Sequence, residues 1–339
     1  MKRLISILAL AMTLIAPSAR ASLPEGAWEL YRQKFVTAEG RVVDDANGNI
    51  SHSESQGYGM LLACLAGDRS AFAGIFAFTR TELLIRDDGL AAWRWDPNAK
   101  PHITDINNAS DGDLLIAQAL ACAGTRWSMP AYTSAARQIA RSLAKVGLLR
   151  RGGDLWLMPG VQGFSEKDRA DGPVVNPSYW VFDALPVMAQ ITGDASWTQV
   201  QASGLKLLDT LAKARQLAPE WLSIKDAPRP ADGFPAQFGY NAIRIPLYLM
   251  RAGLGDRARL EPFRQAWANG TAVIDVATRK PVEPLPDGGY RILAAAMDCV
   301  VDGKALPADL KTFQPTLYYP STLHLLTLSM LAERYPQCM

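Results

Sequence analysis

The chain has 339 residues, of which 49% are hydrophobic and 20% are charged. These values suit a globular protein with a sizeable core, and the length allows one large domain or two small ones. The formal net charge is +2 and no long run of Lys or Arg occurs, which argues against a nucleic-acid-binding protein. The nine Trp residues require a large core, a stacking cleft, or both, because Trp rings are costly to expose.

The N-terminus has the pattern of a secretory signal peptide. Lys2 and Arg3 form a basic start, residues 4–15 are an apolar run, and Ala-Arg-Ala at 19–21 is a small-x-small cleavage site. The run is short for a membrane anchor, and no later stretch has the length of a membrane span. We therefore expect residues 1–21 to be a signal peptide, a mature chain beginning near Ser22, and a periplasmic or secreted protein without a membrane span.

The four cysteines do not form a recognisable metal-binding pattern. Export permits disulfide bonds, yet Cys64 and Cys122 lie in apolar helical stretches and are interpreted as small core residues. A bridge between Cys299 and Cys338 is left open. The spacing of the cysteines matches no zinc site, and the chain has only three His. The sequence therefore predicts no metal centre.

Helical periodicity recurs along the chain, and strand signals are weak. Candidate strands are short, at 41–43, 155–158 and 272–275. Asn176 followed by Pro177, and Ser110 followed by two acidic residues, are typical helix starts. The candidate helices cover 25–36, 54–67, 70–85, 111–126, 130–146, 177–192, 195–214, 240–252, 259–268, 291–301 and 320–334.

These elements predict a single all-α domain of paired helices over residues 22–339. No alternation of strands and helices occurs, no glycine-rich phosphate loop follows a strand, and no low-complexity linker divides the chain. A toroid of paired helices and a superhelical solenoid both fit this order. The absence of a fixed-period repeat argues against the ordinary solenoid families.

The segment SHSESQGYGM at 51–60 places Glu54 at a predicted helix start among three serines, with Gly57 and Gly59 leaving room near the backbone. A carboxyl group beside apolar helix walls has its pKa raised and can act as a general acid. The alternative is that Glu54 only stabilises the helix dipole from the first turn.

The segment NNASDGDLLIA at 107–117 places Asp111 and Asp113 on either side of Gly112, ahead of an apolar helix. Further ligands at fixed spacing are missing, so a calcium or magnesium loop is not indicated. Helix capping is the preferred interpretation for Asp113. Asp111 could instead point into a cleft and hold a sugar hydroxyl or a water molecule.

The segment YNAIRIPLY at 240–248 combines Tyr240, Asn241 and Arg244 at the start of an apolar helix. Tyr240 and Arg244 are four residues apart and share one helix face. Asn241 can be explained as an N-cap. Pro246 removes a helical hydrogen bond and would kink an interior turn.

Aromatic residues gather in the loops between the helices. Trp93, Trp95, Trp156, Tyr179 and Trp180 lie in or beside loops that also carry acids, Gly and Pro. Any one of them could pack in the core, but several in one set of loops beside acids favour a saccharide groove, because sugar faces stack on flat rings. No Ser-His-Asp arrangement is recognisable.

In this order, the motifs SESQGYGM and NNASDGDLLIA resemble glycoside hydrolase family 8, and NPSYW and YNAIRIPLY support the likeness. The segment VIDVATRKPVEP resembles the branch of β-1,4-glucanases associated with bacterial cellulose synthase. The resemblance runs from about residue 25 to 335. It implies an (α/α)6 barrel with an open cleft at one end that cuts β-1,4-glucan internally with inversion.

The resemblance also implies the roles of individual residues. Glu54 would be the general acid, and Asp111 would bind the sugar at the cleavage point and help to place water. Tyr240 and Arg244 would line the same subsite, and Trp95 and Tyr179 would be glucan platforms. No metal or organic cofactor is implied. The partner would be a β-1,4-glucan chain, and the cellulose synthase complex is left open as a second one.

Asn241 departs from the pattern. In the branch that the chain resembles, this position is an Asp that acts as catalytic base, and an amide cannot usefully accept the proton of water. Another carboxylate could serve, and Asp111, Asp171, Asp226 and Asp232 are candidates. Alternatively, Asn241 is an inactivating substitution, or the protein has become a slow or non-catalytic relative.

The sequence thus predicts an exported endoglucanase that trims nascent cellulose. Two alternatives are kept. One is a glucan-binding accessory protein with little turnover because of Asn241. The other is a family-8 enzyme that acts on xylan or chitosan with a base elsewhere.

Overall fold

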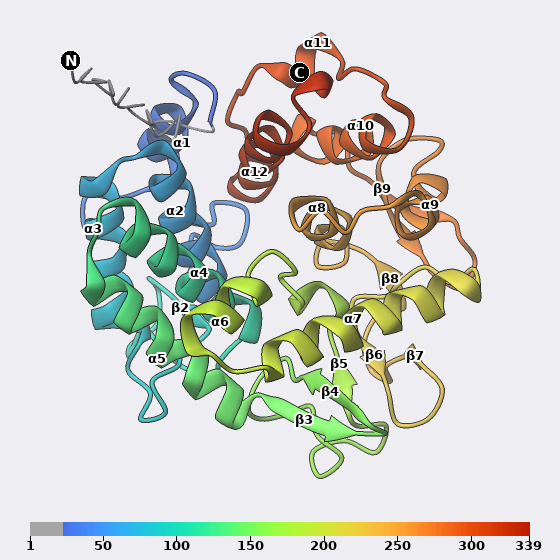
Figure 1. The fold of residues 1–339 in the computed structure, drawn as a ribbon, viewed down its shortest axis with the longest axis horizontal. Helices are drawn as coiled ribbons and strands as arrows, with labels where there is room; N and C mark the ends of the chain where they lie inside the picture. Colours follow the sequence, from blue (N-terminus) through green and yellow to red (C-terminus); the bar gives the residue numbers. More distant parts are fainter. Residues whose placement is uncertain (1–22) are drawn as a thin grey trace, which may run out of the picture.

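Residues 23–339 are described by the computed structural model, and their helices form a ring around a common axis (Figure 1). Inner and outer helices alternate along the chain, and six inner helices line the inside of this ring in the described residues. Successive inner helices touch at α2–α4, α4–α6, α8–α10, α10–α12 and α12–α2. The inner helices are α2 (Ser53–Ala66), α4 (Ser110–Arg126), α6 (Leu185–Thr192), α8 (Arg244–Arg251), α10 (Gly288–Asp302) and α12 (Tyr318–Arg334).

The remaining helices cover the outside of the ring. Helix α3 continues into a π-helical turn, Thr79–Leu83, and packs on α2; α5 packs on α4 and α6; α7 packs on α6 and α9. The outer helices are α1 (Ala27–Phe35), α3 (Arg69–Phe78), α5 (Pro130–Val146), α7 (Ser196–Lys213), α9 (Arg257–Ala266) and the short α11 (Ala308–Lys311). The structure confirms the predicted toroid of paired helices.

Short antiparallel strands connect the helices and form small sheets. Strand β1 pairs with β2, β3 with β4, β6 with both β5 and β7, and β9 with both β8 and β10. The strands are β1 (Ser51–His52), β2 (Arg94–Trp95), β3 (Leu148–Arg151), β4 (Asp154–Leu157), β5 (Val174–Val175), β6 (Leu222–Ser223), β7 (Arg229–Pro230), β8 (Gln237–Phe238), β9 (Ala272–Asp275) and β10 (Pro281–Pro284). Predicted strands at 155–158 and 272–275 thus correspond to β4 and β9, whereas 41–43 contributes only an isolated bridge at Val42.

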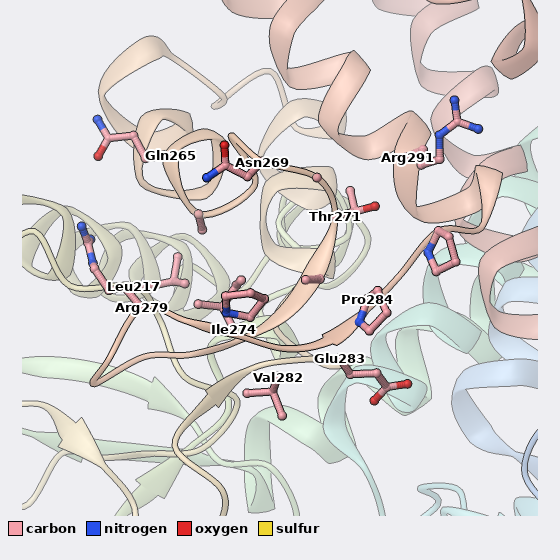
Figure 2. Close-up of a pocket in the computed structure, with 15 residues that line it drawn as sticks. Leu217, Gln265, Asn269, Thr271, Ile274, Arg279, Val282, Glu283, Pro284 and Arg291 are labelled. Atoms are coloured by element: carbon pink, nitrogen blue, oxygen red, sulfur yellow. The ribbon is translucent and has the colours of Figure 1, made fainter.

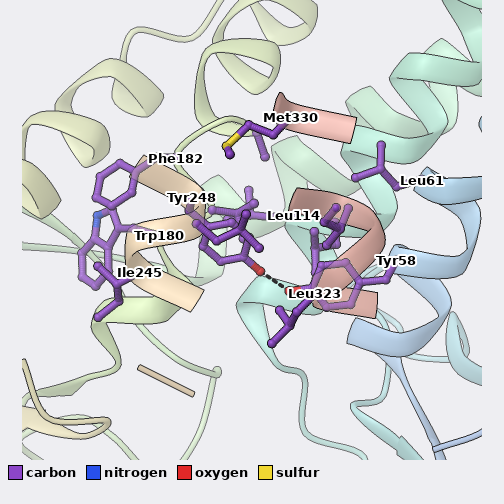
Figure 3. Packing of buried hydrophobic residues seen from close by; sticks show 14 of the residues in the cluster. Tyr58, Leu61, Leu114, Trp180, Phe182, Ile245, Tyr248, Leu323 and Met330 are labelled. Carbon is purple, nitrogen blue, oxygen red and sulfur yellow. Dashed lines mark hydrogen bonds between the residues drawn. The ribbon is translucent and has the colours of Figure 1, made fainter. Parts of the chain in front are cut away.

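Burial separates the inner helices from the outer ones. Helices α4 and α12 are buried around most of their circumference, whereas α5 buries one face, through Ala136, Ile139, Ala140 and Leu143. This is the expected difference between a helix inside a ring and an amphipathic helix on its surface. In Figure 3, Tyr58 of α2 and Tyr248 of α8 meet across the ring interior, and their hydroxyl groups form a hydrogen bond.

Most predicted helices differ from the observed ones by a few residues at their ends, and two differ in how they begin. The stretch 177–192 divides into a 3-10 turn, Pro177–Tyr179, and helix α6, with the buried Trp180 between them. The predicted helix 240–252 begins only at Arg244, so Pro246 lies in the first turn, where its missing N–H needs no partner. The predicted kink in a helix interior is therefore wrong.

The structure corrects the interpretation of two cysteines. Cys64 of α2 and Cys122 of α4 form a disulfide bond with a Cα–Cα distance of 6.4 Å, rather than serving as free core residues. The bridge left open between Cys299 and Cys338 is also present and joins α10 to the C-terminal turn Pro336–Cys338. Sequence spacing alone could not pair Cys64 with Cys122, because neighbouring helices bring together residues that are 58 positions apart.

Replacing both Cys64 and Cys122 by Ala is expected to lower the free energy of unfolding by up to about 4 kcal/mol, the entropic contribution of closing a loop of this length. Urea unfolding of the double variant and of the wild type measures this difference. The comparison is the Cys299→Ala/Cys338→Ala variant, which opens a somewhat shorter loop between α10 and the C-terminal turn. A thiol titration of the denatured, unreduced protein that finds two or more free thiols would contradict the pairing.

Within residues 23–339, no helix is long and apolar enough to cross a bilayer. The predicted signal peptide, residues 1–21, lies outside the described residues.

Candidate active site

Three inner helices begin at the same end of the ring, and each brings one charged side chain to a common point. Glu54 lies in the first turn of α2, Asp111 in the first turn of α4, and Arg244 at the first residue of α8. Arg244 is 1% exposed, as is Asp111, and the Glu54 side chain is 16% exposed. The helix starts thus concentrate two carboxylates and one guanidinium under a small opening.

Arg244 is the centre of this cluster. Its Nη1 donates to Glu54 Oε2 at 2.5 Å and to Asp111 Oδ2 at 2.8 Å, and its Nη2 donates to Ser178 Oγ at 3.0 Å. Nη2 also donates to Asn241 Oδ1 at 3.0 Å. The structure therefore brings together Glu54, Asp111, Asn241 and Arg244, which come from three separate segments of the sequence.

Local sequence explains why α2 and α4 approach so closely here. His52 caps α2 by accepting from the backbone N–H of Ser55, while Ser55 Oγ accepts from the N–H of His52. A Cβ on Gly112 would lie 2.0 Å from Ser53 Oγ and 2.9 Å from the backbone N of Glu54. Only Gly at position 112 permits this packing, which places Asp111 beside Glu54.

Gly112→Ala is expected to force the starts of α2 and α4 apart, because the atoms near the new Cβ include backbone. We expect the free energy of unfolding to fall by about 1–3 kcal/mol and turnover to fall as well. Thermal unfolding and rate measurements on the same sample check both effects. Gly74→Ala is the matched control, since no heavy atom lies within 4 Å of a Cβ there. Normal activity in Gly112→Ala would contradict the claim that close helix packing positions Asp111.

The pKa of Glu54 is raised from its ordinary value. Burial is the main cause because it disfavours the carboxylate, and the neighbouring charge of Asp111 acts in the same direction, while Arg244 and His52 oppose it. A raised pKa keeps a proton on Glu54 in a larger fraction of molecules at mildly acidic pH, as a general acid requires.

A cavity of about 500 Å³ opens above the cluster. The wall of this cavity includes Glu54, Asn241 and Arg244. Aromatic side chains form much of the remaining wall. The lining residues are Asp44, Ala46, Asn47, His52, Glu54, Tyr240, Asn241, Arg244, Tyr290, Leu317, Tyr319 and Pro320. Its size and its mixture of aromatic and polar groups suit a sugar ring.

Asn241 does not act as the N-cap of α8, since that position is Ile243. Instead, its side-chain oxygen accepts from Arg244, and its backbone N–H donates to Glu220 Oε1 at 2.7 Å. Asn241 therefore connects the guanidinium to a carboxylate that the sequence motifs did not indicate.

The carboxylates predicted as substitutes for the missing base have other partners. Asp111 Oδ2 binds Arg244, and its Oδ1 accepts from the N–H of Gly112. Asp171 pairs with Arg169 and accepts from the backbone N–H of Asp232. The side chain of Asp232 pairs with Arg229, and Asp226 is exposed and does not line the cavity above Glu54. Among residues 23–339, no hydrogen bond joins the side chain of Asp171, Asp226 or Asp232 to Asn241 or to Arg244.

The predicted substrate-binding aromatics lie in different surroundings. Tyr240 lines the cavity, is 42% exposed, and donates to Glu283. Tyr179 lies against the guanidinium of Arg244, 5.7 Å from the ring centre. The indole of Trp95 stacks on His102 and also contacts the guanidinium of Arg41. Among the loop aromatics, Trp180 is a core residue, 1% exposed.

Sequence reasoning missed several residues of the site. Tyr290 and Tyr319 line the cavity beside Tyr240, although they lie in the first turns of α10 and α12. Glu220 was also missed. The segment APEWL could have indicated it, because it places an acid before a Trp in a loop that contains Pro. The inner helices α10 and α12 carry the two tyrosines to the site, whereas Glu220 comes from the loop between α7 and β6.

A second cavity of about 850 Å³ lies beside β9 and β10 (Figure 2). Glu283 belongs to its wall, and the carboxylate of Glu283 accepts from Tyr240 at 2.7 Å, so the two cavities are neighbours. Within residues 23–339, no group of three or more His, Cys, Asp or Glu side chains is arranged to hold a metal ion.

Comparison with known proteins gives consistent results. Residues 1–333 match the model of "Glycosyl hydrolases family 8". A "Probable endoglucanase" of Novacetimonas hansenii is 37% identical over 278 residues, which cover 79% of this chain and 80% of the relative. An "Endoglucanase" of Cellulomonas uda is 35% identical over 252 residues, covering 74% of this chain and 68% of the relative.

A solved structure agrees with these matches. The endo-beta-1,4-glucanase CMCax from Acetobacter xylinum superposes with a TM-score of 0.80 at 34% identity, and the match covers 94% of this chain and 99% of that one. The family match spans nearly the whole sequence, and the fold and the clustered motifs agree with it. The chain therefore belongs to family 8 of the glycosyl hydrolases.

Proposed function

We propose that this protein is an endo-acting β-1,4-glucanase that hydrolyses cellulose-type chains with inversion at the anomeric carbon. The observation that carries the proposal is the Glu54–Arg244–Asp111 cluster beneath a cavity large enough for a sugar ring. The named relatives and the solved neighbour, all called endoglucanases or endo-beta-1,4-glucanases, support the choice of substrate.

Glu54 is the general acid in this proposal. It lies in the cavity wall with a raised pKa, so it can protonate the glycosidic oxygen as the bond to the anomeric carbon breaks. Arg244 holds the carboxyl group in place through one hydrogen bond. After the proton is delivered, the same guanidinium stabilises the carboxylate that remains.

Asp111 acts beside the anomeric carbon. Its carboxylate is fixed by Arg244 and by the N–H of Gly112, and its negative charge stabilises the positive charge that develops on the sugar. Tyr240 offers an exposed ring in the cavity wall, and Tyr179 lies against Arg244. Trp95, whose ring contacts His102 and Arg41, stays a predicted glucan platform.

Carboxymethylcellulose tests the proposed activity. An endo-acting enzyme lowers the viscosity of the solution early, before many reducing ends accumulate. With soluble cello-oligosaccharides, proton NMR is expected to detect the α-anomer as the first product, because inversion converts a β-linkage into an α-hemiacetal. Xylan and chitosan assayed in parallel test the other substrates. Faster turnover of either would replace cellulose as the preferred polymer.

A second candidate function follows from Asn241. An amide at this point, bonded to Arg244 and Glu220, cannot itself accept a proton from water. A glucan-binding accessory protein would keep the same cleft without turnover. Binding of cellohexaose measured by calorimetry, together with no new reducing ends over a long incubation, would favour this alternative.

The N-terminal sequence supports an exported enzyme that acts in the periplasm or outside the cell. The likeness of the segment VIDVATRKPVEP to the branch associated with cellulose synthase supports action on glucan emerging from that complex. Mass spectrometry of the mature protein from the periplasmic fraction tests this, with an N-terminus near Ser22 as the expected result. Co-purification with the synthase under mild detergent tests the association. Recovery of the uncleaved chain from the cytosol would contradict export.

A further inference from the structure

An inverting glycosidase needs a group that removes a proton from the attacking water, on the face of the sugar opposite the acid. Asn241 lies in the cavity wall with Glu54, but its amide has no basic site for this proton. The group must therefore be another side chain near Asn241. The identity of this group rests on the proposed glucanase function.

Glu220 is the carboxylate that touches Asn241. Its Oε1 accepts from the backbone N–H of Asn241 at 2.7 Å. The backbone of Glu220 is itself anchored, since its N–H donates to the carbonyl of Gln237 at 2.9 Å. Trp221, the next residue, packs against Tyr179, whose ring lies against Arg244. The carboxylate is thus held at the margin of the cluster by fixed neighbours on both sides.

Gly239 leaves the space that Glu220 occupies. A Cβ at position 239 would lie 2.8 Å from Glu220 Oε1 and 3.3 Å from its carboxyl carbon. Any larger residue at position 239 would push the carboxylate away from Asn241. The close approach of Glu220 is therefore built into the loop before α8.

Glu220 differs from Glu54, Asp111 and Asp44 in its charge partners. Arg244 binds Glu54 and Asp111 directly, but acts on Glu220 only at longer range. Asp44 of the cavity wall lies 3.4 Å from His52. Glu220 is half-buried and forms no ion pair among residues 23–339. A carboxylate without a bound cation keeps its lone pairs available for a proton.

We propose that Glu220 is the general base of this enzyme and accepts the proton of the attacking water beside Asn241. Asn241 is then a positioning residue: its backbone N–H orients Glu220 and its side-chain oxygen is tied to Arg244. The amide carries no charge, so Glu220 is spared the repulsion that a second carboxylate at position 241 would exert.

The step balances without another reactant. The water oxygen forms a bond to the anomeric carbon as the bond from that carbon to the leaving oxygen breaks. Glu220 takes one proton from the water, and Glu54 gives its proton to the leaving oxygen. Solvent then removes the proton from Glu220 and returns one to Glu54, so each turnover consumes one water molecule.

The charge state of Glu220 agrees with this role. Burial raises its pKa, while hydrogen bonds from Asn241 and the charge of Arg244 oppose the change. Since a base must be deprotonated, kcat/KM is expected to fall as the pH drops through this raised pKa. This acidic limb of the pH profile should then belong to Glu220.

The experiment compares the wild type with Glu220→Gln, Asn241→Asp and the double variant on carboxymethylcellulose. Glu220→Gln is expected to lower kcat by about 10²–10⁴-fold, with little change in KM and loss of the acidic limb. In the Glu220→Gln background, Asn241→Asp is expected to restore part of the rate by supplying a new carboxylate. Glu29→Gln, an exposed residue paired with Arg32 on α1, is the control and should leave all rates unchanged.

A further readout separates catalysis from structure. Azide needs no base, so adding it to Glu220→Ala should restore bond cleavage and give an α-glycosyl azide, with Glu54 still protonating the leaving oxygen. Wild-type turnover that persists in Glu220→Gln would overturn the role of Glu220 while leaving the glucanase function intact. If the wild type shows no turnover and the Asn241→Asp variant is active, both the role of Glu220 as base and the proposed native activity are wrong.

Discussion

Glu54→Gln is expected to lower kcat on carboxymethylcellulose by roughly 10⁴-fold, the upper end of what a general acid contributes. Gln has nearly the same shape, so binding of cello-oligosaccharides should stay close to that of the wild type. The thermal stability should change little, because the amide oxygen of Gln can still accept from Arg244 and Asp111 remains as the counter-charge of the guanidinium. Initial rates, calorimetric binding and thermal unfolding measure these three quantities.

A substrate with an activated leaving group sharpens this test. A dinitrophenyl cellobioside needs little protonation, so the defect of Glu54→Gln should be much smaller on it than on cellulose. Glu261→Gln, on the outer helix α9, is the matched control and should retain normal rates. A general acid contributes at least about 10²-fold to the rate. If Glu54→Gln hydrolyses carboxymethylcellulose within about tenfold of the wild-type rate, Glu54 is not the general acid.

Arg244→Met is expected to lower the free energy of unfolding by about 3–5 kcal/mol at neutral pH, the usual cost of breaking a buried ion pair. The guanidinium is 1% exposed and contacts both Glu54 and Asp111, so its loss leaves two adjacent carboxylates without a counter-charge. Turnover should be lost as well, because neither carboxylate keeps its position.

The loss of stability in Arg244→Met should grow as the pH rises. Burial already raises the folded-state pKa of Glu54, and loss of the guanidinium raises it further. The folded protein then binds more protons than the unfolded chain at mildly acidic pH, so its stability falls as pH rises through the raised pKa. Urea unfolding should find the deficit of Arg244→Met small near pH 4 and large near pH 7.

Arg251→Met is the matched control for Arg244→Met. Arg251 is a partly buried residue of the same helix, α8, and binds one carboxylate, Asp183, at 2.9 Å, but it does not line the cavity above Glu54. We expect it to lose stability and to keep catalysis. A stability deficit of Arg244→Met that does not change between pH 4 and pH 7 would contradict the described charge cluster.

The sequence by itself determined the all-α class, the positions of most helices and the acidic and basic residues at three helix starts. These features depend on neighbours within a few positions, namely apolar spacing, caps and proline placement. The same local pattern placed Glu54 and Asp111 in the first turns of apolar helices, whereas their expected roles came from the resemblance to family 8. The departure at Asn241 was also visible from one motif.

Only the tertiary structure decided which of these groups meet. Arg244 is 190 residues from Glu54 and 133 from Asp111, and closure of the ring brings them to hydrogen-bonding distance. The same packing pairs Cys64 with Cys122. It also brings Glu220 to Asn241, in a loop without any regular spacing. Contacts of this range depend on how whole helices pack, and local propensity carries no information about them.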